Sequence, residues 1–370
     1  MQNILSTMNL VQVVPGMFPR VDGIGDFSLK LARRFRAQHG IRTTFLVCDP
    51  TWSGPAEIDD FPVFSVESRS SLGFQDAMQR CKVGAGVSGD TPVYIQFSPY
   101  GYEKRGCPFW LLEALQDFKQ EHLGKLHVFF HELEISKAPP WSSGFWVPGL
   151  QRALIVRLAK MAASRYTHTD AYRTRLEGWG SGRVIQTWSY SSFGEPEIAP
   201  PTPRRKDMII FGRAWQRLHS YTIGDQALQS LCVRLGVERI IDIGPRIEGH
   251  DKPTLAGIPV VRCGRVEADE VDRWMATSLG NFTVYPIDLL QKSSVYQVAS
   301  ANGNITFIYD DGPREISCAG LVTGIDFVPV SKDSSSLALP SLDKLSEALF
   351  NSYQPRRSSV TADLLAGHLF

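Results

Sequence analysis

Short, β-branched apolar runs alternate with longer segments of helical periodicity through most of this chain, and this alternation restricts the possible folds more than any other feature. Residues 9–14 (NLVQVV) are closed by a Pro-Gly pair and predict a buried strand. Residues 26–38 carry phenylalanine and leucine at helical spacing, and residues 43–48 (TTFLVC) predict the next strand. This strand–loop–helix–strand order predicts a parallel βαβ unit.

The same alternation continues in two halves of the sequence. In the first half we expect further strands at 91–97, 125–130 and 166–169 and helices at 108–121, 148–163 and 170–178. In the second half we expect strands at 208–212, 239–243, 259–262, 281–286 and 305–309 and helices at 222–235, 268–278 and 293–301. The predicted fold class is therefore α/β, with two successive α/β halves.

A proline-rich segment separates the two halves. Residues 191–206 (SSFGEPEIAPPTPRRK) contain four prolines, which cannot continue a central strand or a helix interior. Since 370 residues suggest two domains, we predict an N-terminal domain at 1–190, a linker at 191–206 and a C-terminal domain at 207–335. Residues 336–370 are expected to form a tail, helical at 342–353, that could pack back on the N-terminal domain. The alternative is that 191–206 is a long surface loop within one domain.

Charge balance, cysteine spacing and the lack of long apolar runs exclude several classes of partner and site. Lys plus Arg (39) nearly balances Asp plus Glu (38), so no overall field recruits nucleic acid, and at most peripheral membrane contact is expected. The six cysteines never form a CxxC pair, which argues against a zinc ribbon or a thioredoxin-like site and suits the reducing cytosol. We see neither a signal peptide nor an apolar run near the ~20 residues that span a bilayer. A soluble, cytoplasmic protein is expected.

In open α/β sheets ligands bind beyond the carboxyl ends of the strands, so the residues just after each predicted strand are the candidates for a site. The first group follows strand 9–14 and contains Gly23, Gly25 and Asp26. The glycines would let the backbone approach a ligand, and the N-terminus of the next helix, with Asp26 as its expected cap, offers free N–H groups. A glycine turn that serves chain geometry alone is the alternative.

A second group follows strand 125–130. His131 and Glu132 at this strand end could position a sugar hydroxyl or share a proton, although such a pair is often only a loop hydrogen bond. The loop after them contains Trp141, Phe145 and Trp146, which could offer a flat apolar surface to a sugar or simply pack beneath the loop.

The second half of the chain offers cationic candidates. Gly212 and Arg213 end the strand 208–212, Arg217 follows four residues later, and Gly244 ends the strand 239–243. A phosphate-bearing ligand needs fixed positive charge, and the arginine fork suits phosphate oxygens. The alternative is that these are ordinary surface arginines.

Lys292, Ser293 and Ser294 stand just before the predicted helix 293–301. A lysine, two hydroxyls and free helix N–H groups together would suit a diphosphate. One of the two serines could also serve only to cap the helix.

Four segments together resemble the retaining glycosyltransferases of the GT-B fold, in particular the family-4-like group. They are GIGDF, HELEISKAPPW, IIFGR and KSSVYQVASANGNITF, and the similarity covers about residues 9–310. The resemblance implies two Rossmann-like domains facing each other across a cleft and transfer of a sugar from a nucleotide-sugar, of UDP or GDP type, to a hydroxyl acceptor. The acceptor would be a glycan, a lipid-linked glycan or a small molecule, and no metal or cofactor would be needed.

The resemblance also implies roles for individual residues. Gly23, Gly25 and Asp26 would lie near donor phosphate and acceptor, His131 would contact the donor sugar, and Arg213 would bind phosphate. With Arg213, Lys292 would stabilise the departing diphosphate.

The chain departs from the family pattern in two places. The basic residue expected shortly after the arginine is absent from RAWQRLHSY, so Arg217 or His219 would substitute for it. The family's two glutamates, eight positions apart, are replaced by Leu290 and Val298. Because the two glutamates are absent, the sequence does not decide which donor the protein prefers or whether it is active.

Three other functions remain open from the sequence. A nicotinamide-dependent dehydrogenase is suggested by Gly23, Gly25 and Asp49, but the loop before them is long and Ser28 replaces the third glycine. A non-catalytic relative that binds a nucleotide-sugar or glycan would fit the lost glutamates. An epimerase of the same architecture would need a pair of acid/base carboxylates, and the sequence shows no convincing one.

Overall fold

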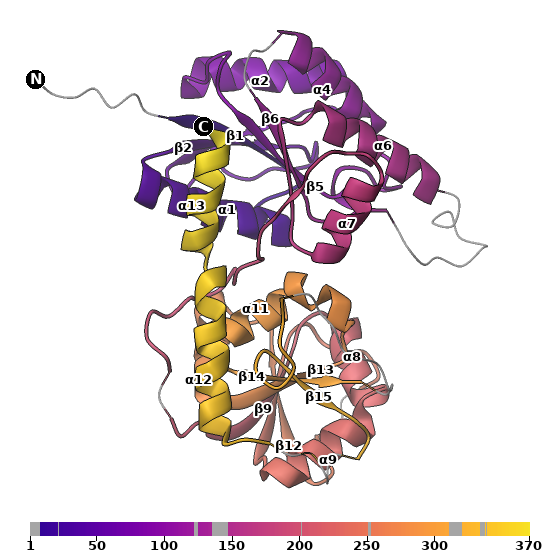
Figure 1. The fold of residues 1–370 in the computed structure, drawn as a ribbon, viewed down its shortest axis with the longest axis vertical. Coiled ribbons are helices and arrows are strands. Elements are labelled where there is room, and N and C mark those ends of the chain that lie inside the picture. Colours follow the sequence, from indigo (N-terminus) through magenta and orange to yellow (C-terminus); the bar gives the residue numbers. More distant parts are fainter. Residues whose placement is uncertain are drawn as a thin grey trace, which may run out of the picture. The chain divides into compact units, whose positions relative to one another are not determined.

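The computed structural model describes two compact units in the ranges 8–20, 22–121, 125–134, 147–200, 202–250, 253–310, 320–333, 337 and 339–370. Unit 1 comprises Met1–Thr187 and Ser358–Phe370, and unit 2 comprises Trp188–Arg357 (Figure 1). The predicted linker 191–206 lies within unit 2, whereas the end of the predicted tail lies within unit 1. Among the described residues, no helix combines the length and the apolar character needed to cross a membrane.

Unit 1 is built on a sheet with the strand order β3-β4-β2-β1-β5-β6-β7-β8. All neighbouring strands pair in parallel except β3 and β4. The strands are β1 (Asn9–Val14), β2 (Arg42–Val47), β3 (Glu57–Ile58), β4 (Phe61–Ser65), β5 (Val93–Phe97), β6 (Leu126–Phe130), β7 (Ser164–Thr167) and β8 (Ile185–Gln186). The central strands are buried on both faces, as expected for a parallel sheet covered by helices.

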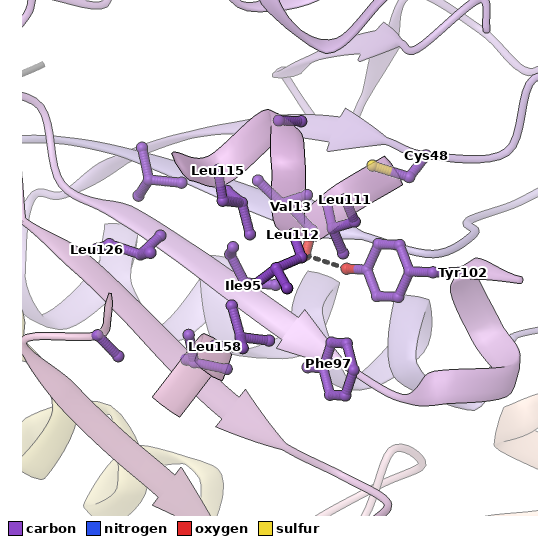
Figure 2. Packing of buried hydrophobic residues seen from close by; sticks show 14 of the residues in the cluster. Val13, Cys48, Ile95, Phe97, Tyr102, Leu111, Leu112, Leu115, Leu126 and Leu158 are labelled. Carbon is purple, nitrogen blue, oxygen red and sulfur yellow. Dashed lines mark hydrogen bonds between the residues drawn. The ribbon is translucent and has the colours of Figure 1, made fainter. Parts of the chain in front are cut away.

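The helices of unit 1 connect these strands and cover both faces of the sheet. They are α1 (Gly23–His39), α2 (Ser71–Ala85), α3 (Pro99–Tyr102), α4 (Phe109–Glu121), α6 (Pro148–Met161), α7 (Asp170–Gly178) and α13 (Ser358–Leu369). On one face, apolar side chains of α2, α4 and α6 pack against alternate strand residues such as Val13 and Ile95. The Tyr102 hydroxyl donates a hydrogen bond of 3.0 Å to the Val13 carbonyl and so ties the turn after β5 to β1 (Figure 2).

The opposite face of this sheet is mixed, because an apolar cluster that includes Val14 and Phe45 lies beside buried polar side chains. Gln12, Gln96 and His127 are all fully buried on it. Helices α1 and α13 pack side by side in unit 1, although one follows β1 and the other ends the chain (Figure 1). Asp363 of α13 accepts from His39 Nε2 at 2.9 Å, which joins the end of α1 to the middle of α13. The residues placed on this face therefore include groups that can hydrogen-bond as well as pack.

Unit 2 contains a second sheet, with the order β11-β12-β10-β9-β13-β14-β15. All neighbouring strands are parallel except β11 and β12. The strands are β9 (Arg205–Phe211), β10 (Arg239–Ile243), β11 (Thr254–Leu255), β12 (Ile258–Gly264), β13 (Ser278–Thr283), β14 (Ile305–Tyr309) and β15 (Val328–Val330). The helical segments are α8 (Ala214–Thr222), α9 (Asp225–Leu235), α10 (Ala268–Thr277), η1 (Ile287–Lys292), α11 (Ser294–Ala301), α12 (Leu342–Tyr353) and η2 (Gln354–Arg356). Apolar clusters fill both faces of this sheet as well.

The structure confirms the predicted α/β class with two mostly parallel sheets. The bounds of β1, β10, β14 and α12 coincide with the predicted ranges. Helices α2, α8 and α13 were not predicted. The expectation that Asp26 caps α1 was wrong: the cap is Asp22, whose Oδ1 accepts from the N–H groups of Ile24 and Gly25 at 2.9 and 3.0 Å.

Packing of α13 should contribute measurably to the stability of unit 1. Leu365 is fully buried, while its neighbour Leu364 is 40% exposed. We expect Leu365→Ala to lower the free energy of unfolding by about 2–5 kcal/mol because it leaves a cavity. Leu364→Ala, the matched control, should change it by less than about 0.5 kcal/mol. Urea unfolding followed by circular dichroism measures both, and equal effects would contradict the packing described.

Candidate functional site

Each sheet contains one point where the order of strands reverses direction. In unit 1 the chain proceeds outward from β1 to β2 and β4 on one side, and from β5 to β6 and β7 on the other. In unit 2 the same reversal lies between β9 and β13. Ligands of open α/β sheets bind outside the carboxyl ends of the strands at such points. We therefore expect candidate ligand-binding residues at these two strand edges, one in each unit.

At the first edge, the predicted glycine group lies in the first turn of α1, not in a loop before it. Gly25 is packed so closely that a Cβ atom there would lie 2.5 Å from the Gly16 carbonyl oxygen. Only glycine allows this approach between the helix start and the strand end. Gly23 is exposed and has open space around it, so the helix start is accessible at that residue.

Asp26 has an unusual environment for a carboxylate on the first turn of a helix. The residue reaches solvent, but partial burial of its carboxyl group and then the charge of Asp22 raise its pKa to about 6, while Arg33 opposes the shift. Near neutral pH this group therefore changes its charge more readily than an ordinary aspartate.

His131 directly follows β6 and is buried to 91% by its position against α1 and β5. Its Nε2 lies 2.8 Å from Gln96 Oε1, and its Nδ1 lies 3.3 Å from His168 Nε2. The Phe27 ring of α1 contacts both imidazoles edge-on, with centroids at 5.1 and 5.3 Å. The predicted histidine thus stands within an ordered polar and aromatic cluster.

Glu132 points to a different partner. It is exposed, and its Oε2 accepts a hydrogen bond of 2.6 Å from the Ser98 hydroxyl at the end of β5. The aromatic residues of the following loop, Trp141, Phe145 and Trp146, lie outside the described residues.

Sequence reasoning missed the two partners of His131. Gln96 lies inside a strand, where it looked like part of an apolar run. His168 directly follows β7, which ends at Thr167, but the predicted strand ran to residue 169 and so placed His168 inside it. A correct strand end would have selected His168, whereas nothing local in the sequence distinguished Gln96.

At the second edge, Gly212 and Arg213 follow β9. Arg213 is exposed, and its guanidinium has no hydrogen bond or ion pair with any residue in the described part of the chain. A Cβ atom built on Gly212 would lie 3.5 Å from Val295 Cγ2, so this strand end lies against the first turn of α11. The strand end that precedes Arg213 and the start of α11 are therefore neighbours in unit 2.

Arg217 is engaged inside the protein. Its side chain is 2% exposed, its Nε donates to Asp242 Oδ1 at 2.5 Å, and its Nη1 donates to the Pro245 carbonyl at 2.5 Å. Gly244 has a φ of +143°, and a Cβ there would lie 2.4 Å from the Gly212 carbonyl oxygen. Arg217 thus holds the turn after β10 through the Pro245 carbonyl, and Gly244 of this turn contacts Gly212 at the end of β9.

The predicted diphosphate group is placed at the start of α11. Lys292 ends η1 and is half-buried, and Ser293 caps α11 by accepting from the Tyr296 N–H at 3.4 Å. Ser294 is exposed in the first turn. The expectation that one of these serines caps the helix is confirmed for Ser293.

The positions of the missing glutamates are occupied by core residues. Leu290 and Val298 are both fully buried, each in an apolar cluster of unit 2. Within the described ranges, no three His, Cys, Asp or Glu side chains are grouped closely enough to hold a metal ion.

Solved structures share this architecture. Sucrose-phosphate synthase from Thermosynechococcus elongatus is 12% identical, with a TM-score of 0.65 over 98% of each chain. An alpha-glucosyltransferase in complex with UDP and a 13-mer DNA is 11% identical, with a TM-score of 0.58 over 98% of this chain and 99% of that chain. The lipopolysaccharide outer core galactosyltransferase WaaB is 10% identical, with a TM-score of 0.57 over the same shares. No family model and no curated protein matches the sequence. The chain has the two-domain α/β fold of the GT-B glycosyltransferases.

The raised pKa of Asp26 predicts a pH-dependent stability. The folded protein keeps the Asp26 proton up to about pH 6, whereas the unfolded chain releases it near 3.8. The stabilisation is complete below about pH 4 and is lost as the pH rises through about 6. Relative to the wild type, Asp26→Asn should therefore gain melting temperature from about pH 4 to about pH 7 and change little above that. Asp90→Asn, at an exposed position, is the control and should show no such trend.

The buried ion pair between Arg217 and Asp242 predicts that replacing Arg217 and replacing Arg213 affect stability differently. Arg217→Met should destabilise the protein by about 3–5 kcal/mol, because the buried Asp242 would lose its close partner and keep only Arg262, whose Nε lies 4.0 Å from Asp242 Oδ2. Arg213→Met should change stability by less than about 0.5 kcal/mol. The double variant Arg217→Met/Asp242→Leu should recover much of the loss, since it removes both charges. Denaturant unfolding of the three proteins measures this, and a harmless Arg217→Met would contradict a structural role.

Proposed function

We propose that this protein is a glycosyltransferase that moves a sugar from a nucleotide-sugar to a hydroxyl acceptor without a metal ion. The observation that carries the proposal is the exposed Arg213 directly after Gly212, at the strand end that lies against the first turn of α11 in unit 2. A diphosphate needs fixed positive charge and free N–H groups, and a helix start supplies the latter. Arg213 and this helix start supply both at the switch point, where α/β sheets bind ligands.

The proposed chemistry is mainly electrostatic. As the bond to the sugar breaks, charge develops on the departing diphosphate, and Arg213, Lys292 and the N–H groups at the start of α11 would stabilise it. Ser293 and Ser294 would donate further hydrogen bonds. Arg217 does not belong to this set, because its side chain is buried and is held inside the protein by Asp242 and the Pro245 carbonyl. We therefore propose for it a supporting role beneath the site.

The finer parts of the proposal follow from the resemblance. We infer a retaining reaction, in which the acceptor hydroxyl attacks the face that the diphosphate leaves, and a role for His131 at the donor sugar. UDP is the first donor base to test, because an alpha-glucosyltransferase of the same fold was solved with UDP. The names of the neighbours point to acceptors as different as lipopolysaccharide and DNA, so we propose only a glycan, a lipid-linked glycan or a small molecule as the acceptor class.

A non-catalytic relative is the second candidate. Leu290 and Val298 stand where the resembling enzymes carry glutamates, and both side chains are buried in the core. Neither position can therefore hold a sugar hydroxyl. This observation favours a protein that retains a nucleotide-sugar without transferring it.

The test is thermal stabilisation by UDP, GDP, ADP, TDP and NAD in the absence of added metal. A ligand at one hundred times its dissociation constant should stabilise the protein by about 2.7 kcal/mol. We expect one nucleoside diphosphate to give this shift and NAD to give none. A shift with NAD alone would support the dehydrogenase instead, and a shift without sugar transfer from the matching nucleotide-sugar would support the non-catalytic relative.

Arg213→Met should reduce the nucleotide-dependent shift to less than half, because it removes the charge that holds the diphosphate. Arg205→Met is the matched control, since Arg205 is exposed at the opposite end of the same strand. Isothermal titration of both variants measures the affinities directly. Equal affinities would refute the proposed site.

A further inference from the structure

We propose that His168 and Gln96 are positioning residues that hold His131 as a neutral imidazole with its proton on Nε2. The inference rests on the proposed function for its role in catalysis, but its physical content is a property of unit 1 alone. The three residues come from successive strands, β5, β6 and β7, at one edge of the sheet.

The direction of the hydrogen bonds follows from the amide of Gln96. Its Nε2 donates to Gln12 Oε1 at 3.2 Å, so its Oε1 is the acceptor that faces His131 Nε2 at 2.8 Å. An acceptor at this distance requires a proton on His131 Nε2. A neutral imidazole carries a single N–H, so His131 Nδ1 must be an acceptor.

His168 supplies the donor that this tautomer needs. Its Nε2 lies 3.3 Å from His131 Nδ1, and its side chain is buried. Two charged imidazolium rings at this distance would repel each other strongly in a site with little water. The Phe27 and Phe129 rings pack against both histidines and limit their rotation.

The consequence concerns what His131 can do. Both of its ring nitrogens are engaged within the sheet, so it has no nitrogen prepared to act as a general base. A neutral ring of fixed orientation suits the placement of a sugar better than proton transfer. His168 would act on the reaction only through this orientation.

The experiment is nitrogen NMR of the protein labelled at its eight histidines, with His131→Phe to assign the resonances. We expect the wild type to carry the His131 proton on Nε2. In His168→Phe, which keeps a ring but loses the donor, the Nδ1 resonance should move toward that of an imidazole without a hydrogen bond. His168→Gln places an amide N–H near the same position and should restore the shift. His127→Phe is the control, because it replaces another buried histidine of β6 and should leave His131 unchanged.

A kinetic measurement tests the link to function. His168→Phe should lower kcat/KM about tenfold, as expected for the loss of one positioning hydrogen bond of about 1.4 kcal/mol, and His168→Gln should recover most of it. A proton on Nδ1 in the wild type, or an Nδ1 resonance unmoved in His168→Phe, would overturn the proposal. Normal kinetics despite a moved resonance would overturn the role in positioning. Absence of all transfer activity would refute the proposed function, while the NMR result would still decide the tautomer.

Discussion

The ion pair between Arg217 and Asp242 is the interaction on which the proposed phosphate site depends. Asp242 is fully buried near the end of β10, and an uncompensated carboxylate there would repel a diphosphate bound at the neighbouring strand end. Arg217 neutralises it and also donates to the Pro245 carbonyl, which fixes the turn that contains Gly244. Because this turn touches Gly212, one buried arginine sets both the charge and the shape of the edge that presents Arg213.

At the strand edge of unit 1, the feature that needs explanation is the burial of polar side chains. One face of its sheet is filled by apolar side chains, but the other buries glutamine, histidine and tyrosine side chains beneath α1 and α13. Such groups are costly unless they are hydrogen-bonded, and Gln12, Gln96, His131 and His168 form a connected row. His127 lies apart from this row, and burial lowers its pKa to about 4, so it stays neutral. The polar face is therefore ordered where the candidate site lies.

Of the fifteen strands in the described residues, the sequence predicted the ten whose apolar runs stand out from polar, proline or glycine residues, as in β1, and missed β3, β4, β8, β11 and β15. It did not predict α13, whose buried residues Thr361, Ala362, Leu365 and Leu369 include few strongly apolar side chains. Nor did it predict the pairing of His131 with His168, which are 37 residues apart and meet only through the register of β6 with β7. Strand ends can be read from local patterns, whereas contacts between strand ends depend on topology that local patterns do not contain.

The loss of the two glutamates is best explained together with the cations that remain. Leu290 and Val298 are buried in apolar clusters, and a carboxylate at either position would have to be desolvated without a partner on the described residues around it. Both positions therefore belong to the apolar core of unit 2. The positive charge near the strand edge comes from Arg213 and Lys292. Such an edge would supply positive charge to a phosphate, as the proposed function requires, but it has no carboxylate at these two positions for sugar hydroxyls. In the proposed reaction, discrimination between donor sugars would therefore have to come from residues at other positions.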